Sequence, residues 1–420
     1  MLDINFIIEN KKKVEEAIRN KGIKCDLKAL LSADKERRSL LQKVEELNRK
    51  RNENAASMKP KGAKPDPRQI EEGKRIKEEL AKLDPALREV EARFNDVMLR
   101  VPNVYSDDTP VGKDDSENKE LRTWGKIPKF DFPAKDHLQL GTELDLIDTE
   151  RGTKVVGFRG YFLKNDLARL HWAVMTYAFN KMIAKGYSPF ITPSLVNEIG
   201  LTATGWFPLV KDQVYPVEDK FLSGTAEVAL MGYRANEIIE TKELPLKYCG
   251  FSPCFRREAG SYGKDTKGLY RVHEFWKVEQ VVICENDLSV SLALFEELLH
   301  IAEEILQDLG LAYRVLAICT GDMGAGKYKM YDIETWMPSR KSYGETHSCS
   351  LLTDWQARRA NIRYRASDGS VRYPHTMNNT VIASPRILIA LLENYQQADG
   401  TIAVPKVLQP LMGGQKSIGA

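Results

Sequence analysis

The residues best suited to bind anions lie in two short segments near positions 256 and 275. Arg256 and Glu258 are two residues apart and are followed by a polar stretch, residues 259–274, and then by Phe275. Side chains two apart share one face of a strand, so the spacing predicts a strand that carries Arg256 and Glu258 together. An arginine there can fork onto a phosphate or carboxylate, and a phenylalanine on the returning strand can stack on a flat base. Taken alone, an Arg-x-Glu pair is usually a surface ion pair.

The returning segment alternates polar and apolar residues, with Lys277 and Glu279 on either side of Val278. This alternation predicts a strand. Because Glu279 lies among apolar neighbours, its side chain is either a binding group or one member of a buried ion pair. His347 and Ser348 suggest a nucleophile pair, but adjacent residues of a strand point to opposite faces, which argues against a catalytic triad.

Two other patterns exclude classes of site. Gly321–Lys327 matches the first seven positions of a phosphate-binding P-loop, but Tyr328 replaces the hydroxyl that would bind magnesium, and a strand-like segment follows where a helix is required. The six cysteines are sparse and form no pair of pairs that could complete a zinc site: Cys25, Cys249, Cys254, Cys284, Cys319 and Cys349. They indicate reduced, mostly buried thiols in a cytoplasmic protein, with Cys349 as a packed thiol.

Two long apolar seams precede these residues and indicate a separate module. The stronger seam recurs at spacings of four and three through Ile76, Leu80, Leu83, Leu87, Val90, Phe94, Val97 and Val101. A weaker one runs through Leu30, Ala33, Arg37, Leu40, Val44 and Leu47. Residues 58–67 between them are rich in helix breakers, and Asp66 with Pro67 suits the start of a second helix. The pattern predicts an antiparallel coiled-coil hairpin over about 27–100, kinked at Pro85.

The rest of the chain predicts a second, mixed domain. Residues 102–135 are rich in Pro, Asp and Lys and predict a linker with little regular structure. Apolar spacing predicts a helix over 167–185 that ends at Gly186, a strand to Pro193, and a helix over 288–309 capped by Asp287. Alternation at 328–336 and 361–365 predicts antiparallel strands. The fold class is therefore α+β, a coiled-coil arm plus a mixed, mainly antiparallel β-sheet flanked by helices.

Composition excludes several classes of protein. The chain has 420 residues, 42% of them hydrophobic, which excludes a wholly disordered chain. No apolar run approaches the ~20 residues of a membrane span, and the start does not read as a secretory signal. Charge is nearly balanced, 62 Lys and Arg against 59 Asp and Glu, yet residues 35–64 carry ten basic residues and four Glu. That cluster is either a solvated helix face or a patch for a phosphate-rich partner.

Together these motifs resemble the class II aminoacyl-tRNA synthetases, and among them the seryl-tRNA synthetases. The three class motifs correspond to Lys185–Pro193, to Phe255–Glu258 with the loop to Phe275, and to Asn378–Arg386, although Ala383-Ser384-Pro385 replaces the glycine-rich run of many members. Seryl-specific elements are Thr225–Glu227, Gly260–Gly263, Glu345–Ser348, Trp355–Arg359 and Glu393–Tyr395. The chain ends 25 residues after Tyr395, too few for the C-terminal anticodon-binding domain of prolyl, threonyl or histidyl relatives.

The resemblance implies an enzyme that activates L-serine with ATP to seryl-adenylate and transfers serine to tRNA(Ser), and to tRNA(Sec) where present. It implies a class II catalytic domain over 136–420, a linker over 111–135 and a tRNA-binding domain over 1–110. It also implies a cytoplasmic homodimer whose arm reaches tRNA bound across the dimer, with no membrane contact. Rival interpretations are a binding protein descended from a synthetase and an arm-only scaffold for RNA or protein.

Residue roles also follow from the resemblance. Arg256, Glu345 and Arg386 would be catalytic, and Glu345 and Ser348 would bind Mg²⁺. Serine would be bound by Thr225, Ala226, Glu227, Arg256, Glu279 and Thr380. ATP would be bound by Arg256, Arg257, Glu258, Val272, Phe275, Glu345, Thr346, His347, Ser348 and Arg386. The arm would contact tRNA through Arg37, Arg38, Lys43, Arg49, Lys50 and Arg51. On local sequence alone, Thr225 and Glu227 could instead lie at the end of a strand, and Trp276 and Trp355 are expected in the core.

Overall fold

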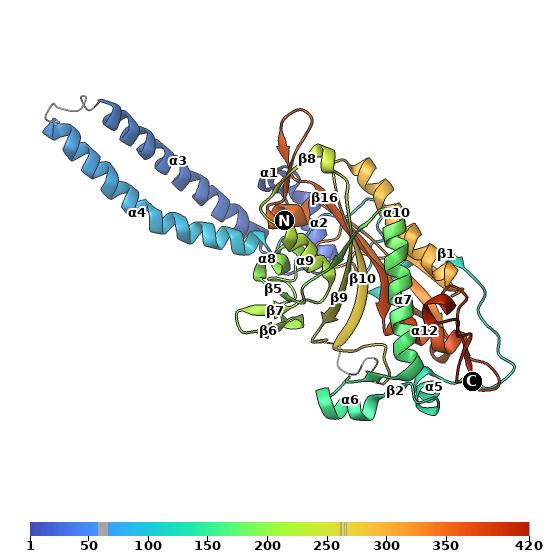
Figure 1. The fold of residues 1–420 in the computed structure, drawn as a ribbon. Coiled ribbons are helices and arrows are strands. Elements are labelled where there is room, and N and C mark those ends of the chain that lie inside the picture. Colours follow the sequence, from blue (N-terminus) through green and yellow to red (C-terminus); the bar gives the residue numbers. More distant parts are fainter. Residues whose placement is uncertain (58–65, 261–262, 264, 266, 420) are drawn as a thin grey trace. The chain divides into compact units, whose positions relative to one another are not determined.

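The chain divides into two units, which the computed structural model describes over residues 1–57, 66–260, 263, 265 and 267–419 (Figure 1). The arm unit consists of Leu2–Ile18 and Ile23–Val101. The sheet unit consists of Met1, Arg19–Gly22 and Pro102–Ala420. None of the helices in the described ranges combines the length and apolar character needed to cross a membrane.

The arm unit is an antiparallel pair of long helices, as the two seams predict. Its helices are α1 (Ile4–Glu9), α2 (Lys11–Asn20), α3 (Leu27–Ser57) and α4 (Pro67–Met98). Seam residues such as Leu30, Ile76 and Val90 are buried, and Arg93 of α4 pairs with Glu36 of α3 at 3.0 Å. The Asp66 carboxylate accepts from the Arg68 N–H at 2.9 Å, which confirms the predicted start of α4.

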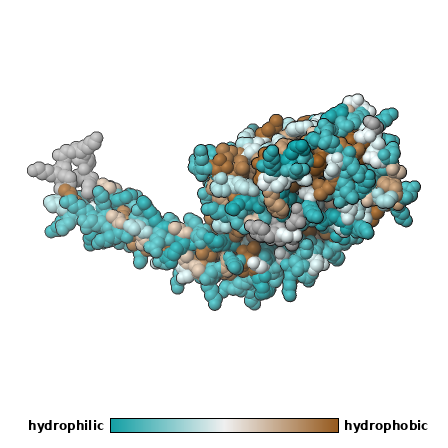
Figure 2. All heavy atoms as spheres, turned by 90° about the horizontal axis from the view of Figure 1, so that it is seen from below, coloured by the Kyte–Doolittle hydropathy of each residue, from teal (hydrophilic) through white to brown (hydrophobic). Residues whose placement is uncertain are grey.

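Two further features of the arm bear on its predicted details. Pro85 lies inside α4, which continues through it as one helix and bends partway along its length (Figure 1). The predicted breaker segment lies mostly outside the described residues, which resume at Asp66. Side chains on the arm are largely hydrophilic, as Figure 2 shows. The face of the arm seen in Figure 2 therefore shows little apolar surface.

The sheet unit is built on eight strands in the order β1-β11-β12-β13-β16-β10-β9-β4. All neighbours are antiparallel except β4 and β9, which are parallel, so the predicted mixed, mainly antiparallel sheet is confirmed. The strands are β1 (Lys119–Trp124), β4 (Ser188–Ile191), β9 (Leu246–Phe255), β10 (Glu274–Cys284), β11 (Tyr313–Ala317), β12 (Lys329–Met337), β13 (Ser342–Thr353) and β16 (His375–Ser384).

The two faces of this sheet have different neighbours. Alternate residues of β10, Val278 and Val282, pack into the large core with α7 (Asn165–Ala184), α10 (Leu288–Asp308) and α12 (Arg386–Asn394). The intervening residues Val281 and Ile283 face α9 (Ala226–Tyr233) instead. Because Glu279 lies in phase with Val281, its side chain belongs to the α9 face. Polar residues on that face are therefore candidates for a binding site.

The predicted helices end where the sequence places their caps. Asp287 accepts from the Ser289 and Val290 N–H groups at the start of α10, and Gly186 follows α7 with φ +85°. The remaining helices are α5 (His137–Glu143), α6 (Thr149–Val156), α8 (Glu198–Thr204) and α11 (Trp355–Ala360), with short turns η1 (Asp115–Glu117), η2 (Lys211–Gln213), η3 (Thr241–Glu243), η4 (Pro338–Arg340) and η5 (Gln409–Met412). Trp355 is buried as expected, and half-buried Trp276 stacks on Phe251.

Two predictions about regular structure hold only in part. The segment 102–135, expected to be a linker with little regular structure, is mostly irregular but contributes η1 and β1, because the backbone of 119–124 pairs with β11 and extends the sheet. The antiparallel strand predicted near 361–365 is β14 (Arg363–Arg365), which does pair antiparallel with β15 (Val371–Arg372). It also runs parallel to β8 (Ile238–Glu240), and the three strands form a small sheet separate from the large one. Other short strands are β2 (Ile147–Asp148), β3 (Phe162–Leu163), β5 (Leu195–Val196), β6 (Tyr215–Val217), β7 (Lys220–Leu222), β17 (Ile402–Ala403) and β18 (Ser417–Ile418).

Candidate active site

Arg256 follows β9 and is held between two aromatic rings. Its guanidinium carbon lies 5.2 Å from the ring centroid of Phe275 and 5.6 Å from that of Trp206. Its Nε and Nη2 donate to the Gly224 carbonyl at 3.4 and 3.3 Å. Phe275 lies on β10, so the two segments that the sequence singled out do meet. Trp206 is a neighbour that no sequence pattern indicated.

The prediction that Arg256 and Glu258 share one face of a strand is wrong. β9 ends at Phe255, because the Arg257 N–H donates to the Gln213 carbonyl of η2 at 2.9 Å rather than continuing the ladder with β10. Glu258 then adopts φ +52°. Its carboxylate pairs with Arg271 at 2.8 Å and lies 4.0 Å from Arg159. Glu258 is therefore part of an arginine cluster beside the site.

Glu279 and Thr380 face each other across two neighbouring strands. They are register partners in β10 and β16, next to a bulge between Val278 and Glu279. Glu279 is 2% exposed and forms an ion pair with the buried Lys277, and its Oε1 accepts from Asn378 Nδ2 at 3.4 Å. The buried ion pair that the sequence offered as an alternative is thus present. Oε2 makes that ion pair and Oε1 accepts from Asn378, so both oxygens of this buried carboxylate are held in place.

Thr225 and Glu227 lie at the start of α9, not at the end of a strand, because β7 already stops at Leu222. The Thr225 hydroxyl caps the helix by accepting from the Glu227 N–H at 3.3 Å. Glu227 is buried, and its carboxylate accepts from Gln356 Nε2 at 2.6 Å. Ala226, the first residue of α9, packs into the apolar cluster beneath. One helix start thus presents a hydroxyl and a carboxylate together.

The pKa of Glu279 shows which groups surround it. Burial raises this pKa above its ordinary value, and the carboxylate of Glu227 raises it further, while Lys277 and Arg256 act in the opposite direction. Two carboxylates and two cations therefore converge in a small, poorly solvated space. Such a neutral set suits a zwitterion, with its ammonium group near the two carboxylates and its own carboxylate near Arg256.

Glu345, on β13, and Arg386, the first residue of α12, form the other end of the site. Arg386 Nη1 lies 3.1 Å from Glu345 Oε2 and donates to the Glu345 carbonyl at 2.9 Å. Partial burial alone would raise the pKa of Glu345, but Arg386, with Arg256 and Arg271 behind it, holds that pKa below its ordinary value. The Arg386 guanidinium also lies 4.4 Å from the ring centroid of Tyr270.

Oxygen ligands for a divalent cation gather beside this pair. Ser348 faces Asp332 across β13 and β12, and its hydroxyl bonds the Asp332 carboxylate. Asp332 is 9% exposed, and its Oδ1 has no hydrogen-bond partner among the described residues. Burial, then the charge of Glu345, raises the pKa of Asp332. No group of three His, Cys, Asp or Glu able to hold a metal occurs in the described ranges, yet two carboxylates and a hydroxyl fit Mg²⁺.

Several expected ATP residues face away from this space. Thr346 exchanges a hydrogen bond with Thr335 at 2.7 Å, and His347 Nε2 lies 3.0 Å from the Val381 carbonyl. Burial lowers the pKa of His347 to about 4. His347 and Ser348 thus bond different partners, as expected of adjacent residues on a strand. Val272 is buried at 5% exposure, and Cys349 is a buried thiol.

The arm cations differ in how far their charges are already paired. Arg37 and Arg38 both contact the buried carboxylate of Asp34, at 3.1 and 2.7 Å. Lys50 pairs with Glu46 at 2.8 Å, and Arg49 lies 3.8 Å from Glu53. Lys43 and Arg51 are exposed, with no ion pair among the described residues.

Models of two protein families match the chain. One, described as the seryl-tRNA synthetase N-terminal domain, matches residues 1–105. The other, the tRNA synthetase class II core domain (G, H, P, S and T), matches residues 211–395. The two matches fall on the arm-bearing part and on the part that carries Arg256, Glu279, Glu345 and Arg386.

Known proteins resemble the chain over its whole length. Serine–tRNA ligase of Deinococcus radiodurans is 49% identical, with 100% of this chain and 99% of the relative covered, and that of Treponema denticola is 46% identical over 98% and 99%. The crystal structure of seryl-tRNA synthetase from Pyrococcus horikoshii complexed with ATP aligns with TM-score 0.89 and 37% identity, covering 100% and 99%. Prolyl-tRNA synthetase of Giardia lamblia, at 18% identity and TM-score 0.56, shares the fold alone.

Proposed function

The chain belongs to the seryl-tRNA synthetases, the class II enzymes that activate serine with ATP and charge tRNA(Ser), and on this premise we propose how its own residues divide that work. The observation that carries the proposal is the position of Arg256. Its charge opposes the burial that raises the pKa of Glu279, and it adds to Arg386 in lowering the pKa of Glu345, so one guanidinium acts on both ends of the site. Two anions that must react, a carboxylate and an α-phosphate, would meet at this group.

Serine binds at the Glu279 end. Its ammonium lies between the carboxylates of Glu227 and Glu279, and its carboxylate faces Arg256. Its hydroxyl is bound by Glu279, Thr380 and Thr225, whose positions follow from the β10–β16 register and the α9 cap. Buried polar groups left without a partner are costly, so alanine should be activated about 10⁴-fold less efficiently than serine.

ATP binds along the arginines. Adenine stacks on the Phe275 face that Arg256 does not cover, with Glu258, Arg257 and Val272 around it. Because the side chains of Thr346 and His347 are bonded inside the sheet, their contacts with ATP come from backbone groups. The serine carboxylate attacks the α-phosphorus, and pyrophosphate leaves toward Arg386, so no side-chain nucleophile is required.

Glu345 and Ser348, with Asp332 behind them, would hold Mg²⁺, which when bound would neutralise phosphate charge. The arm, through the exposed Lys43 and Arg51 and the partly paired Arg49 and Lys50, binds the tRNA backbone. Arg37 and Arg38 contribute less, because they share the Asp34 carboxylate, which compensates one of their two charges.

The enzyme acts as a homodimer in the cytoplasm, where its six free thiols remain reduced. The dimer forms at the edge strand β4, where Ile191 is 84% exposed beside an apolar groove of about 310 Å³ that also includes Tyr233. The arm of one subunit reaches tRNA bound to the other, and tRNA(Sec) is charged where it exists. Sedimentation at micromolar concentration tests the dimer, and Ile191→Glu should shift it to monomers.

Serine-dependent exchange of pyrophosphate into ATP, followed by charging of tRNA(Ser), tests these assignments. Removing residues 36–93 with a short Gly/Ser link should leave exchange near its original level and abolish charging. A protein that binds ATP without exchange would be a binding protein rather than an enzyme of this family. Charging that survives removal of the arm would contradict its role in binding tRNA.

A further inference from the structure

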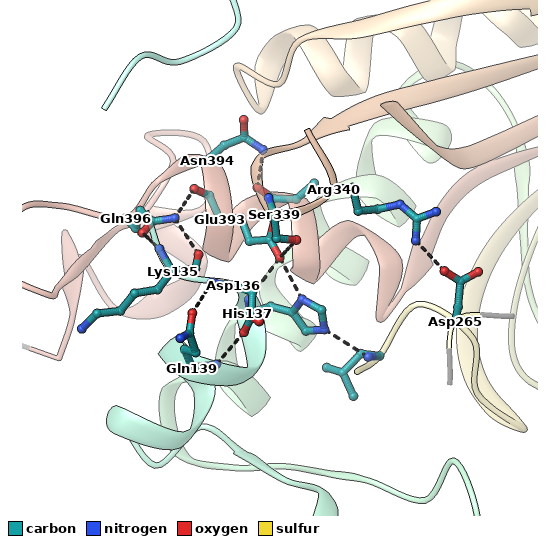
Figure 3. Close-up of polar contacts among 12 residues, drawn as sticks. Lys135, Asp136, His137, Gln139, Asp265, Ser339, Arg340, Glu393, Asn394 and Gln396 are labelled. Carbon is teal, nitrogen blue, oxygen red and sulfur yellow. Dashed lines mark hydrogen bonds and ion pairs between the residues drawn. The ribbon is translucent and has the colours of Figure 1, made fainter. Parts of the chain in front are cut away.

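Glu393, near the end of α12, is a fully buried carboxylate that none of the proposed substrate contacts uses. Its oxygens accept four hydrogen bonds (Figure 3). Two come from His137, through the backbone N–H at 3.1 Å and Nδ1 at 2.8 Å. Two come from Ser339, through the backbone N–H at 2.9 Å and the hydroxyl at 2.8 Å. Such a donor set satisfies a buried charge, and it joins α12 to the start of α5 and to η4.

The hydrogen bonds of His137 define its tautomer. Its Nε2 lies 3.2 Å from the Leu269 backbone N–H, which can only donate. Nε2 must therefore carry the lone pair, and Nδ1 must carry the proton that faces Glu393. The imidazole thus links the buried carboxylate to the segment 268–270, which leads from the polar loop back into β10.

Gly268 is required for this contact. Its φ is +80°, and a Cβ at this position would lie 2.3 Å from His137 Nε2. Only glycine combines this backbone conformation with so close an approach of the backbone to the ring. The segment is therefore shaped to receive the imidazole.

Both links from Glu393 end at Tyr270. Leu269 precedes Tyr270, while Arg340 follows Ser339 and its guanidinium lies 4.2 Å from the Tyr270 ring centroid. Tyr270 in turn contacts Arg386, whose Nε donates to its carbonyl at 3.0 Å and whose guanidinium lies 4.4 Å from its ring. Arg386 and Glu393 are seven residues apart on α12 and so lie on the same face of that helix. The contacts through Tyr270 therefore connect the two ends of α12, in addition to the helix backbone itself.

We propose that Glu393 and His137 are positioning residues that set the Arg386 guanidinium through the backbone and ring of Tyr270. The inference rests on the proposed role of Arg386 at the leaving pyrophosphate. Neither residue touches substrate. They determine where Tyr270 lies, and Tyr270 determines the direction of the Arg386 N–H groups. We call this set of contacts, from Glu393 and His137 through Tyr270 to Arg386, the relay. Breaking the relay should therefore impair the binding and reaction of ATP and leave serine binding, at the far end of the site, unchanged.

A pair of amide substitutions at His137 separates the two hydrogen bonds of the ring. In His137→Asn the side-chain amide can still donate to Glu393 but is too short to reach Leu269. In His137→Gln the longer side chain can place an oxygen near the position of Nε2 and accept from the Leu269 N–H. Loss of one such bond corresponds to about a tenfold change. In pyrophosphate exchange we expect His137→Asn to raise the KM for ATP about tenfold and lower kcat, with the KM for serine unchanged and His137→Gln recovering most of the loss.

Gln139→Ala is the matched control, because Gln139 stabilises the start of the same helix by accepting from the Asp136 N–H at 3.0 Å without touching the relay. It should lower the melting temperature and leave both KM values unchanged. Ser339→Ala, which removes only the hydrogen bond from the Ser339 hydroxyl to Glu393, should raise the KM for ATP about threefold. This variant provides the test if His137→Asn does not fold.

Unchanged ATP kinetics in a folded His137→Asn or Ser339→Ala enzyme would overturn the relay. Equal losses for ATP and serine would also overturn it, because they would indicate a general structural role. Absence of serine-dependent exchange in the unmodified enzyme would instead contradict the proposed function, so the two failures are distinguishable.

Discussion

The two units present cations to anionic partners in different ways. In the sheet unit, Arg256 lies between two rings and Arg386 is bound to Glu345 and Tyr270, so neither guanidinium has to be ordered when a ligand arrives. On the arm, Arg49 is 70% exposed and Lys50 pairs only with a glutamate one turn away. Fixed charges in a partly desolvated site act strongly at short range, whereas exposed charges are screened by salt.

This difference predicts how each region responds to change. Removing a fixed arginine should raise the reaction barrier, and the size of this effect should depend little on salt concentration. Removing an arm cation should weaken binding slightly and alter its salt dependence.

Arg386→Ala and Glu345→Ala should each reduce kcat/KM for pyrophosphate exchange by about 10³-fold or more. Arg386→Ala loses the positive charge at the leaving group, and Glu345→Ala loses the carboxylate proposed to hold Mg²⁺. The loss should be similar at 50 and 200 mM salt. Arg365→Ala is the matched control, since Arg365 pairs with Glu240 on a half-exposed surface at 3.6 Å. A loss of less than about tenfold in either variant would show that the fixed arginine end is assigned wrongly.

Glu279→Ala should raise the KM for serine by about 10²-fold and leave the KM for ATP unchanged. The variant removes a carboxylate from the ammonium and also leaves Lys277 as an unpaired buried cation. Lys277→Met is the informative comparison, because it keeps the carboxylate but removes its partner and should raise the Glu279 pKa further. If serine activation in Glu279→Ala matched that of the unmodified enzyme, Glu279 would be a structural ion-pair member only.

The arm was largely predictable from sequence, because its contacts are local and periodic. The seams and the Asp66 cap depend on side chains within a few residues of one another, as do the Gly186 and Asp287 helix boundaries of the sheet unit. The mainly antiparallel sheet was also predictable from alternation. Its strand order and register were not, because they depend on partners far apart in the sequence.

The active site shows the same limit. From the sequence we predicted that Arg256 lies near Phe275, which is right, and that Glu258 lies on a strand, which is wrong. Nothing in the local sequence shows that the Arg257 N–H donates to the Gln213 carbonyl. Asp332 was missed, although a carboxylate between Tyr331 and Ile333 in an alternating strand was a usable signal. Its relation to Ser348 appears only in the β12–β13 register. Tyr270 and His137 likewise have roles that are set by long-range contacts.

The two units should differ in how acid changes their free energy of unfolding. Burial lowers the pKa of His171 and of His347 to about 4 in the folded chain, against about 6.5 when unfolded. As pH falls, each histidine binds a proton at higher pH in the unfolded chain than in the folded chain. Its contribution to the free energy of unfolding is therefore fully present above about pH 6.5 and decreases as pH drops toward 4, by about 2 kcal/mol per histidine at pH 5. The arm unit contains no histidine.

Tryptophan fluorescence, which reports only the sheet unit because all six tryptophans lie beyond residue 101, should therefore show acid destabilisation before helical circular dichroism from the arm is lost. His171→Gln should reduce the dependence of the unfolding free energy on pH by about one proton between pH 4.5 and 6. An unchanged pH dependence in that variant would show that His171 is not held neutral.

The smallest expected effect lies on the arm and tests whether its charges act as screened contacts. Lys43→Ala and Arg51→Ala should each weaken tRNA(Ser) binding only a fewfold at 150 mM salt and lower the slope of log Kd against log salt by up to about one unit. Arg38→Ala should lower that slope less, because Arg38 shares the Asp34 carboxylate, at 2.7 Å, with Arg37 and is partly compensated by it. The three variants form a matched set on one helix, two exposed and one paired. If Arg38→Ala lowered the slope as much as Arg51→Ala, the Asp34 ion pair would have to open when tRNA binds. If none of the three altered it, the basic cluster would be a solvated face, and the arm would have to bind tRNA by shape alone.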